Sequence, residues 1–309
     1  MTTLQARARH AEFGLDAPGN NRQARVQALL ARVEEPYREP CRSILAGEPF
    51  TFTQAWQDWW LFHNLYFDRL TWGDGAYVDI GTNDPTAISN TLFFDKCLGW
   101  KGVCFEPQQR YHERIRTTRS CHLVPRCVLG SAQTVHMAGS GTTSRVRVGG
   151  GAGDGEAVTC APADGVLRSL GFGNATHQQL DLLSVDVEGF EAEVLRCFPF
   201  REFGVQHVLL ETNAVQNFRA VDRFFHRHGY ASIETFTHGK RNQPESGHWL
   251  DNLFEYRGPA RHPPTGRHGV DCSKGSPLVK GMMAFCAPWQ SWAPASQPWG
   301  QCSKLEPKA

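Results

Sequence analysis

The sequence predicts an α/β protein with a Rossmann-like domain, in which helices cover both faces of a mostly parallel sheet of about seven strands, and with an N-terminal helical cap. Two observations predict this fold. From residue 76 onward, short apolar runs alternate with stretches of helical periodicity, as in chains of βαβ units. The first apolar run, 76–80, also leads directly into a glycine-containing turn, where open α/β sheets bind ligands.

The composition is that of a globular protein. Of 309 residues, 40% are hydrophobic and 20% are charged, which provides for a sizeable core and excludes wholesale disorder. A net charge of +1 disfavours nucleic acid and anionic membranes as partners. No apolar run reaches the roughly 18 residues of a membrane span, and the first residues lack the apolar core of a signal peptide. We therefore expect a soluble, cytoplasmic protein, and the oligomeric state stays open.

Residues 1–72 are expected to form the helical cap. Apolar residues recur at helical spacing over 20–35, until Pro36 and Pro40 end the pattern. A second amphipathic helix is predicted over 53–70, where aromatic residues are dense. Such residues usually pack in a core, and stacking on an acceptor is the alternative reading for Trp56, Trp59, Trp60 and Trp72.

Residues 73–257 are expected to form the ligand-binding domain. Its predicted strands lie at 76–80, 102–105, 122–129, 181–187, 205–210, 230–234 and 252–256, and its predicted helices at 89–98, 108–118, 191–197 and 215–228. Ser89 is predicted to cap the first of these helices. The Gly-, Ser- and Thr-rich segment 139–155 is predicted to be a flexible loop, and 258–309 a weakly ordered tail.

Ten cysteines raise the question of disulfides or a metal site. Four of them fall in or beside apolar segments and are predicted to be buried thiols: Cys97, Cys104, Cys127 and Cys197. Three others lie in the tail at separations that match no zinc site, although a disulfide among them is possible: Cys272, Cys286 and Cys302.

The turn after the first strand, together with the end of the next strand, indicates an adenosine ligand. Gly81 lets the backbone approach a ligand closely, while Asp79 and Asn83 can orient an ammonium group and hydroxyls. Glu106 ends the next strand, where its two oxygens can accept both hydroxyls of a ribose. A structural turn with a solvated Glu106 is the alternative.

The residues after the turn favour a ligand without phosphate. A dinucleotide site needs a G-x-G-x-x-G turn whose amides surround a pyrophosphate. Here one glycine is followed by Asp84, which would repel phosphate, and Pro85, which lacks an amide donor. This disfavours a nucleotide-dependent oxidoreductase and favours S-adenosyl-L-methionine as the cofactor.

Four motifs, in order along the chain, resemble those of the FkbM family of S-adenosylmethionine-dependent methyltransferases. They are Tyr77-Val-Asp-Ile-Gly-Thr-Asn-Asp84, Ser89-Asn-Thr91, Gly99-Trp-Lys-Gly102 with Glu106-Pro107, and Asp186-Val-Glu-Gly-Phe-Glu191. The resemblance covers about 53–257 and includes Asp251, whereas Pro85 stands where the family usually has glycine. It implies a class I methyltransferase fold. It also implies that the cofactor is bound by Gln57, Asp58, Asp79, Gly81, Thr82, Asn83, Ser89, Asn90 and Glu106, with the first two closing the pocket from the cap.

Three carboxylates are candidates for the chemistry. Methyl transfer needs an aligned acceptor and often a base. Asp186 is expected to orient the acceptor or cofactor, Glu188 is the candidate base, and Glu211 binds the acceptor or braces the Asp186 loop. No obligatory metal is expected, and His238 and His248 are the histidines expected near the cleft.

The function predicted is O-methylation of a hydroxyl on a small-molecule or sugar-like acceptor. A non-catalytic FkbM-like binding or trafficking protein is the alternative. Because a fold does not fix a substrate, the acceptor itself is not readable from the sequence.

Overall fold

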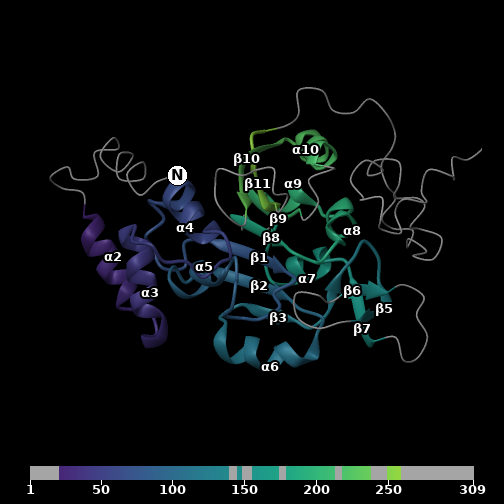
Figure 1. The fold of residues 1–309 in the computed structure, drawn as a ribbon, viewed down its shortest axis with the longest axis horizontal. Coiled ribbons are helices and arrows are strands. Elements are labelled where there is room, and N and C mark those ends of the chain that lie inside the picture. The colour runs from purple at the N-terminus through teal and green to yellow at the C-terminus, as the bar shows by residue number, and fades with distance from the viewer. Residues whose placement is uncertain are drawn as a thin grey trace, which may run out of the picture.

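The computed structural model describes residues 21–138, 145–147, 155–173, 179–212, 218–237 and 249–258. Their main sheet has seven strands in the order β10-β11-β9-β8-β1-β2-β3 (Figure 1). All neighbours in it are parallel except the first two pairs of this order, β10 with β11 and β11 with β9. The strands are β1 (Ala76–Ile80), β2 (Lys101–Phe105), β3 (His122–Val124), β8 (Leu182–Val185), β9 (His207–Glu211), β10 (Tyr230–Thr237) and β11 (Trp249–Tyr256). The predicted Rossmann-like α/β fold is confirmed.

The chain changes direction across the sheet between β1 and β8. From β1 it proceeds outward to β2 and β3, and it later returns to the other side of β1 with β8 and β9. Open α/β sheets bind ligands at the carboxyl ends of the strands that flank such a switch point. The residues that follow β1 and β8 are Gly81 and Asp186, so the fold places these two at the expected ligand edge.

One face of the main sheet carries a large hydrophobic core. Ala76, Val78 and Ile80 point into it from β1 because alternate residues of a strand face the same side. Four helices cover this face and bury side chains in the same cluster: α7 (Asp164–Ser169), α8 (Glu191–Arg196), α9 (Phe200–Phe203) and α10 (Phe218–Arg227).

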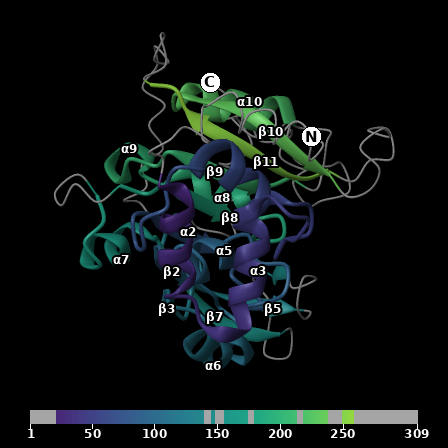
Figure 2. The ribbon, with the colours of Figure 1, turned by 90° about the vertical axis from the view of Figure 1, so that its left-hand side faces the viewer.

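The N-terminal helices cover the opposite face, as Figure 2 shows with α2 and α3 in front of the strands. Leu29, Ile44 and Phe62 of this cap share one buried cluster with Tyr77 and Leu182 of the sheet. The cap therefore completes the sheet's second face and has no separate core; its boundary at residue 72 stays a prediction. The elements of this layer are α2 (Arg22–Leu30), α3 (Glu35–Ala46), α4 (Gln57–Leu61), the π-helix η1 (Phe62–Tyr66) and α5 (Leu92–Lys96).

The cap differs from the prediction in two places. The helical pattern was expected to end at Pro36, but α3 begins there, because the fixed φ of proline suits the first helical turn. Pro40 lies inside the same helix. The long helix expected over 53–70 is instead the short α4 followed by η1. Ser89 also does not cap α5, whose N-cap is Thr91.

A second, four-stranded sheet in the order β4-β7-β5-β6 was not predicted. It consists of β4 (Cys127–Val128), β5 (Gln133–Ala138), β6 (Arg145–Arg147) and β7 (Glu156–Ala161). The single strand expected over 122–129 is thereby divided between two sheets, with α6 (Gln109–Thr118) preceding it. Of the loop predicted over 139–155, residues 145–147 are strand β6 and 155 is described; the other residues of the loop and the tail 259–309 lie outside the described residues.

The prediction of buried thiols is wrong. Three disulfides join Cys41 to Cys97, Cys104 to Cys121 and Cys127 to Cys160, with Cα–Cα distances of 5.4, 5.8 and 4.4 Å. Cys197 is also disulfide-bonded. The partners are 56, 17 and 33 residues apart along the chain, so only the packing of distant elements reveals the pairing. The tail cysteines lie outside the described residues.

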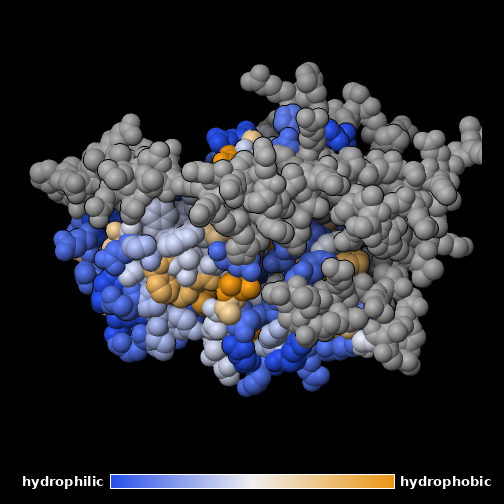
Figure 3. Space-filling view, in the orientation of Figure 1, coloured by the Kyte–Doolittle hydropathy of each residue, from blue (hydrophilic) through white to orange (hydrophobic). Residues whose placement is uncertain are grey.

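The face seen in Figure 3 is largely hydrophilic over the described residues, with an apolar area near its centre. The described residues contain three exposed large hydrophobic side chains, Trp56, Ile88 and Leu170. Nowhere in the described part of the chain is there a helix of the length and apolarity that a bilayer span requires.

Candidate active site

Two adjacent cavities lie at the carboxyl ends of β1, β2 and β8. The first, here called the apolar cavity, measures about 690 Å³, and the second, the acidic cavity, about 910 Å³. Four residues line both cavities, so the two are continuous parts of one region: Gly81, Asn83, Asp186 and Glu188.

The two cavities have different linings. Most of the apolar cavity is lined by hydrophobic side chains: Ile80, Phe105, Pro107, Val128, Leu129, Met137, Val187 and Phe190, beside Cys127 and Cys160. Its polar lining outside the shared residues is Glu106 and Gln108. The acidic cavity adds three carboxyl groups and several neutral polar groups to the shared residues: Asp79, Glu211 and Asp251 with Gln54, Gln57, Thr82, Ser89, Asn90 and Ser184.

The charge of this region is one-sided. Among the described residues that line the two cavities, six are carboxylic acids and none is lysine, arginine or histidine. Buried carboxylates favour a ligand that brings positive charge. A pyrophosphate, by contrast, would find no cationic side chain here.

Gly81 is required by the backbone that surrounds it. Its φ is +91°, in the left-handed region, and a Cβ atom there would lie 1.9 Å from the carbonyl oxygen of Asp186. The sequence predicts that this glycine allows close approach of a ligand. The structure shows that it first allows close approach of the β8 turn, which brings Asp186 beside the β1 turn.

Backbone strain is concentrated at the same region. The described residues include four non-glycine residues with positive φ: Trp56 (+68°), Asn83 (+54°), Ile88 (+50°) and Glu188 (+55°). The last three line a cavity, and Trp56 directly precedes Gln57 of the acidic cavity. Such conformations cost of the order of 1–3 kcal/mol each and cluster at functional sites.

Glu106 lies at the border of the apolar cavity and is only 1% exposed. Its Oε2 accepts a hydrogen bond from the amide of Asn83 at 2.6 Å, and its Oε1 accepts one from the amide of Gln108 at 2.7 Å. Burial raises the pKa of Glu106 to about 7 in spite of these bonds. Each oxygen retains a second lone pair, so the carboxylate can still accept two ligand hydroxyls.

Asp79 belongs to a buried network that the sequence analysis missed. Its Oδ2 accepts a hydrogen bond from Thr91 Oγ1 at 2.7 Å. Arg119, whose side chain is fully buried, donates to Thr91 Oγ1 at 2.7 Å, to Ser89 Oγ at 3.2 Å and to Asp95 at 2.5 Å. Burial raises the pKa of Asp79, and Arg119 opposes that shift. A single arginine after a helix gives no signal in sequence, yet it orders one wall of the acidic cavity.

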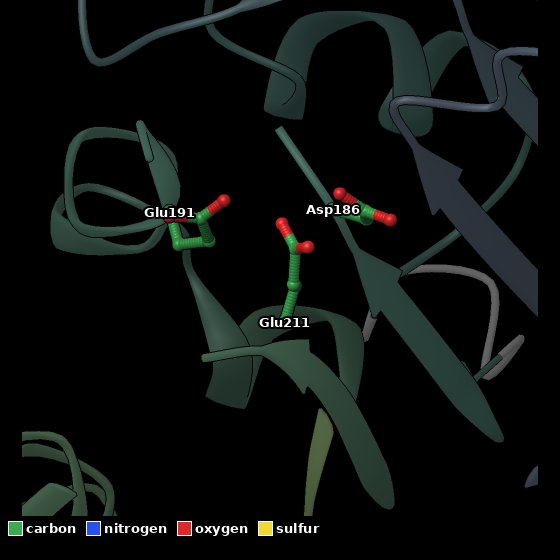
Figure 4. A group of neighbouring side chains, drawn as sticks. All are labelled: Asp186, Glu191 and Glu211. Atoms are coloured by element: carbon green, nitrogen blue, oxygen red, sulfur yellow. The ribbon is translucent and has the colours of Figure 1, made fainter. Parts of the chain in front are cut away.

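Asp186 and Glu211 form a hydrogen-bonded carboxyl pair, and Figure 4 shows the Glu211 side chain extending from its strand toward Asp186. Two carboxyl groups can hydrogen-bond only if one of them carries a proton. Burial raises the pKa of both acids, and the charge of Asp186 raises that of Glu211 further, so the pair holds one proton, which we assign to Glu211. Asp186 also accepts a hydrogen bond from the backbone amide of Glu188.

Glu191 completes a group of three acids whose oxygens lie within 4.8 Å of one another. Its Oε1 accepts hydrogen bonds from the amides of Val187 at 3.1 Å and Gly189 at 3.0 Å. Glu191 therefore braces the turn that carries Glu188. The spacing of these acids would suit a cation. However, Asp186 and Glu211 share a proton, and Oε1 of Glu191 already accepts two backbone hydrogen bonds, so these groups are less able to act as metal ligands.

The two cap residues of the resemblance have different environments. Gln57 lines the acidic cavity, is 1% exposed and donates a hydrogen bond to Asp251 of β11. Asp58 lines neither cavity; it is 0% exposed and accepts hydrogen bonds from the amides of Phe52 and Trp59, each at 2.8 Å. Asp58 thus organises the turn before α4. It was expected to help close the cofactor pocket, but its position does not support that role.

Asp84 has a different environment from the one that was expected. Asp84 was expected to repel phosphate, but its carboxylate accepts hydrogen bonds from its own loop and pairs with Arg114 at 2.6 Å. It lines neither cavity. His238 and His248 lie outside the described residues. The remaining predicted residues, Thr82, Ser89 and Asn90, line the acidic cavity.

Comparison with known proteins identifies the family. Residues 79–232 match the family model described as the methyltransferase FkbM domain. No curated protein matches the chain in sequence. One matching solved structure is described as "crystal structure of a putative RNA methyltransferase PH1948 from Pyrococcus horikoshii"; it is 10% identical, covers 76% of this chain and 98% of its own, and has a TM-score of 0.33. That likeness is too weak to support an argument. The chain thus belongs, through residues 79–232, to the FkbM methyltransferase family.

Proposed function

We propose that this methyltransferase uses S-adenosyl-L-methionine to methylate a hydroxyl group of a small-molecule or carbohydrate acceptor. The observation that supports this most strongly is the pair of continuous cavities, one apolar and one lined by carboxyl groups without a cationic side chain. The cofactor has the same division: an apolar adenine and a part that carries sulfonium and ammonium charges. A phosphate-bearing nucleotide fits this lining poorly.

The residues present fit the cofactor group by group. Phe105 and Leu129 are among the apolar residues that would contact adenine. Glu106 and Asn83 stand at the border of the apolar cavity, where ribose hydroxyls need acceptors. Ser89 and Asn90 offer hydroxyl and amide groups to the amino-acid end. We infer that the acceptor enters the remaining part of the acidic cavity.

The bound cofactor supplies an electrophilic methyl group, and the chain supplies alignment and a proton acceptor. Asp186 is held at the end of β8 by Glu211, which donates to it and is itself neutral. The charge of this pair therefore resides on Asp186, which we assign as the acceptor of the hydroxyl proton. Glu188 lines both cavities and is the alternative base. Enclosure of the site would exclude water and leave the acceptor oxygen less solvated.

Isothermal titration of the purified chain with S-adenosylmethionine, its demethylated product and NADH tests the proposal. We expect saturable binding of the first two and none of NADH. Glu106→Gln should weaken binding roughly 10- to 100-fold, because it removes a buried charged acceptor. Glu193→Gln is the matched control, since Glu193 is also buried, burial raises its pKa to about 8, and it lines neither cavity.

Two outcomes would contradict the proposal. Folded wild-type protein that binds neither cofactor form would indicate a non-catalytic role, and saturable NADH binding would indicate an oxidoreductase. If the cofactor binds, acceptors are screened with a labelled methyl group, and the product is analysed by mass spectrometry. Methyl groups found only on nitrogen or carbon would contradict O-methylation.

A further inference from the structure

The apolar cavity takes its lining from both sheets of the protein. Ile80 and Phe105 come from the main sheet, whereas Val128 and Met137 come from the second sheet. The Cys127–Cys160 disulfide lies in the same lining and joins β4 to β7 within the second sheet. A covalent cross-link is therefore part of the wall that would contact the cofactor.

Few other interactions hold this wall together. β4 has two residues, and its ladder with β7 has two register pairs, Cys127 with Cys160 and Val128 with Ala161. One further bond, from the Leu129 amide to the Ala161 carbonyl at 3.2 Å, continues the pairing. The hydrophobic cluster behind it contains four buried residues, and β4 touches the core of the main sheet through Val128. So short a parallel ladder contributes little stability alone.

The other two disulfides whose partners are both described lie elsewhere. Cys41 and Cys97 are 0% exposed and belong to the cluster between the cap and the sheet, as does Cys104. Neither the Cys41–Cys97 bond nor the Cys104–Cys121 bond lines either cavity. Only the bond in the second sheet is placed to act on a ligand, within the described residues.

We propose that the Cys127–Cys160 disulfide positions the wall of the adenine subsite, so that the affinity for the cofactor depends on its oxidation. This inference rests on the proposed function. A dithiol reduces the bond by giving two electrons and two protons; two thiols form, and the dithiol becomes a disulfide. The sulfur atoms then separate from a bond length of about 2.0 Å to van der Waals contact, and β4 is released from β7.

The first experiment compares two double variants under non-reducing conditions. Titration of C127S/C160S with S-adenosylhomocysteine and with adenosine should give a Kd roughly tenfold higher than wild type. We expect this because residues that line a binding site lose affinity when they are no longer held in place. C41S/C97S is the matched control and should bind within about twofold of wild type. It removes a bond that spans 56 residues instead of 33, so in the loop-entropy view its loss costs at least as much stability.

A second measurement keeps the inference testable if a variant does not fold. Folded wild-type protein is treated with increasing dithiothreitol, the thiols are alkylated, and mass spectrometry reports which bonds are reduced. The Kd for S-adenosylhomocysteine should rise in step with reduction of Cys127–Cys160, while circular dichroism stays native. A Kd that instead follows reduction of Cys41–Cys97 would overturn the inference.

The outcomes separate this inference from the function on which it rests. If oxidised wild type binds no cofactor, both fall. If wild type and C127S/C160S bind equally, the function stands and the positioning role is wrong. An equal loss of cofactor affinity in C127S/C160S and C41S/C97S would also overturn the positioning role, because the effect would then reflect general destabilisation.

Discussion

The two cavities meet at the same turn but arise from the sequence in different ways. The apolar cavity is made largely from strand residues and from the small cluster of the second sheet. The acidic cavity depends on carboxyl groups from β1, β8, β9 and β11, and on how each modifies the protonation of its neighbours. The apolar cavity is suited to recognise an apolar group, for which shape is decisive. The acidic cavity is suited to chemistry, for which charged groups must be held close together.

The largest effect is expected where the cavities join. Gly81→Ala would place a Cβ atom 1.9 Å from the Asp186 carbonyl oxygen in a left-handed conformation. Because both partners are backbone, we expect a loss of about 4 kcal/mol or more in the free energy of unfolding, and loss of cofactor binding. Urea denaturation and calorimetry measure the two effects.

Gly171→Ala is the control for this variant. Gly171 has a similar φ of +85°, and a Cβ atom there meets nothing within 4 Å. This variant should lose about 1 kcal/mol in the free energy of unfolding, which is the cost of holding alanine in a left-handed conformation, and it should keep cofactor binding. Equal losses in the two variants would show that the contact between the β1 and β8 turns is unimportant.

The next effect separates charge from hydrogen bonding within the acidic cavity. Asp186→Asn removes the charged member of the carboxyl pair and should lower kcat roughly 100-fold or more. Glu211→Gln preserves a neutral donor and should lower kcat by less than about tenfold. The rates are measured with an acceptor from the screen. The reverse order would assign the proton acceptor to Glu211.

A smaller effect concerns pH. Burial raises the pKa of Glu106 from 4.5 to about 7 and that of Asp251 from 3.8 to about 7, so the folded state holds protons that the unfolded state has lost. This stability is fully present below pH 4 and is lost as pH rises through 7, by at most about 1.4 kcal/mol per pH unit for each group.

Urea unfolding at pH 5, 6, 7 and 8 without cofactor checks this dependence. Stability should decrease across the series, and the decrease should be shallower in a Glu106→Gln/Asp251→Asn variant. Stability that rises from pH 5 to 8 would show that these acids are ionised in the folded protein.

The smallest effect is expected on removing metal ions. Because Glu211 donates a hydrogen bond to Asp186 and Glu191 binds backbone amides, we expect chelation to change the Tm by less than about 1 °C and the cofactor Kd by less than about twofold. A Tm that rises with Mg²⁺ or Mn²⁺ in wild type, but not in Glu211→Gln, would instead establish a cation site at these three acids.

The sequence predicted those parts of the fold that have a strong local pattern. The strands 76–80 and 102–105 and the helix 108–118 were placed within one residue of β1, β2 and α6. It missed β4, because two residues carry no periodicity. It also merged β3 with β4 into one strand over 122–129, although Pro125 and Arg126 separate their apolar residues.

The candidate site was predictable where residues follow a strand and unpredictable where they depend on a distant partner. Asp79, Gly81, Glu106, Asp186 and Glu211 were all located from strand ends, and the structure brings them to one region. Nothing local indicated that Asp58 would be enclosed in its own loop. Arg119 was missed because its role depends on residues about 30 positions away.

By itself, the sequence determined the alternation of strands and helices, the glycine turn after β1 and the family, because these depend on local periodicity and on short motifs. Tertiary structure alone decided which cysteines pair, which two carboxyl groups share a proton and which strands line the apolar cavity. The physical reason is range. Periodicity acts over a few residues, whereas disulfides, proton sharing and enclosure require atoms far apart in sequence to come within a few ångströms.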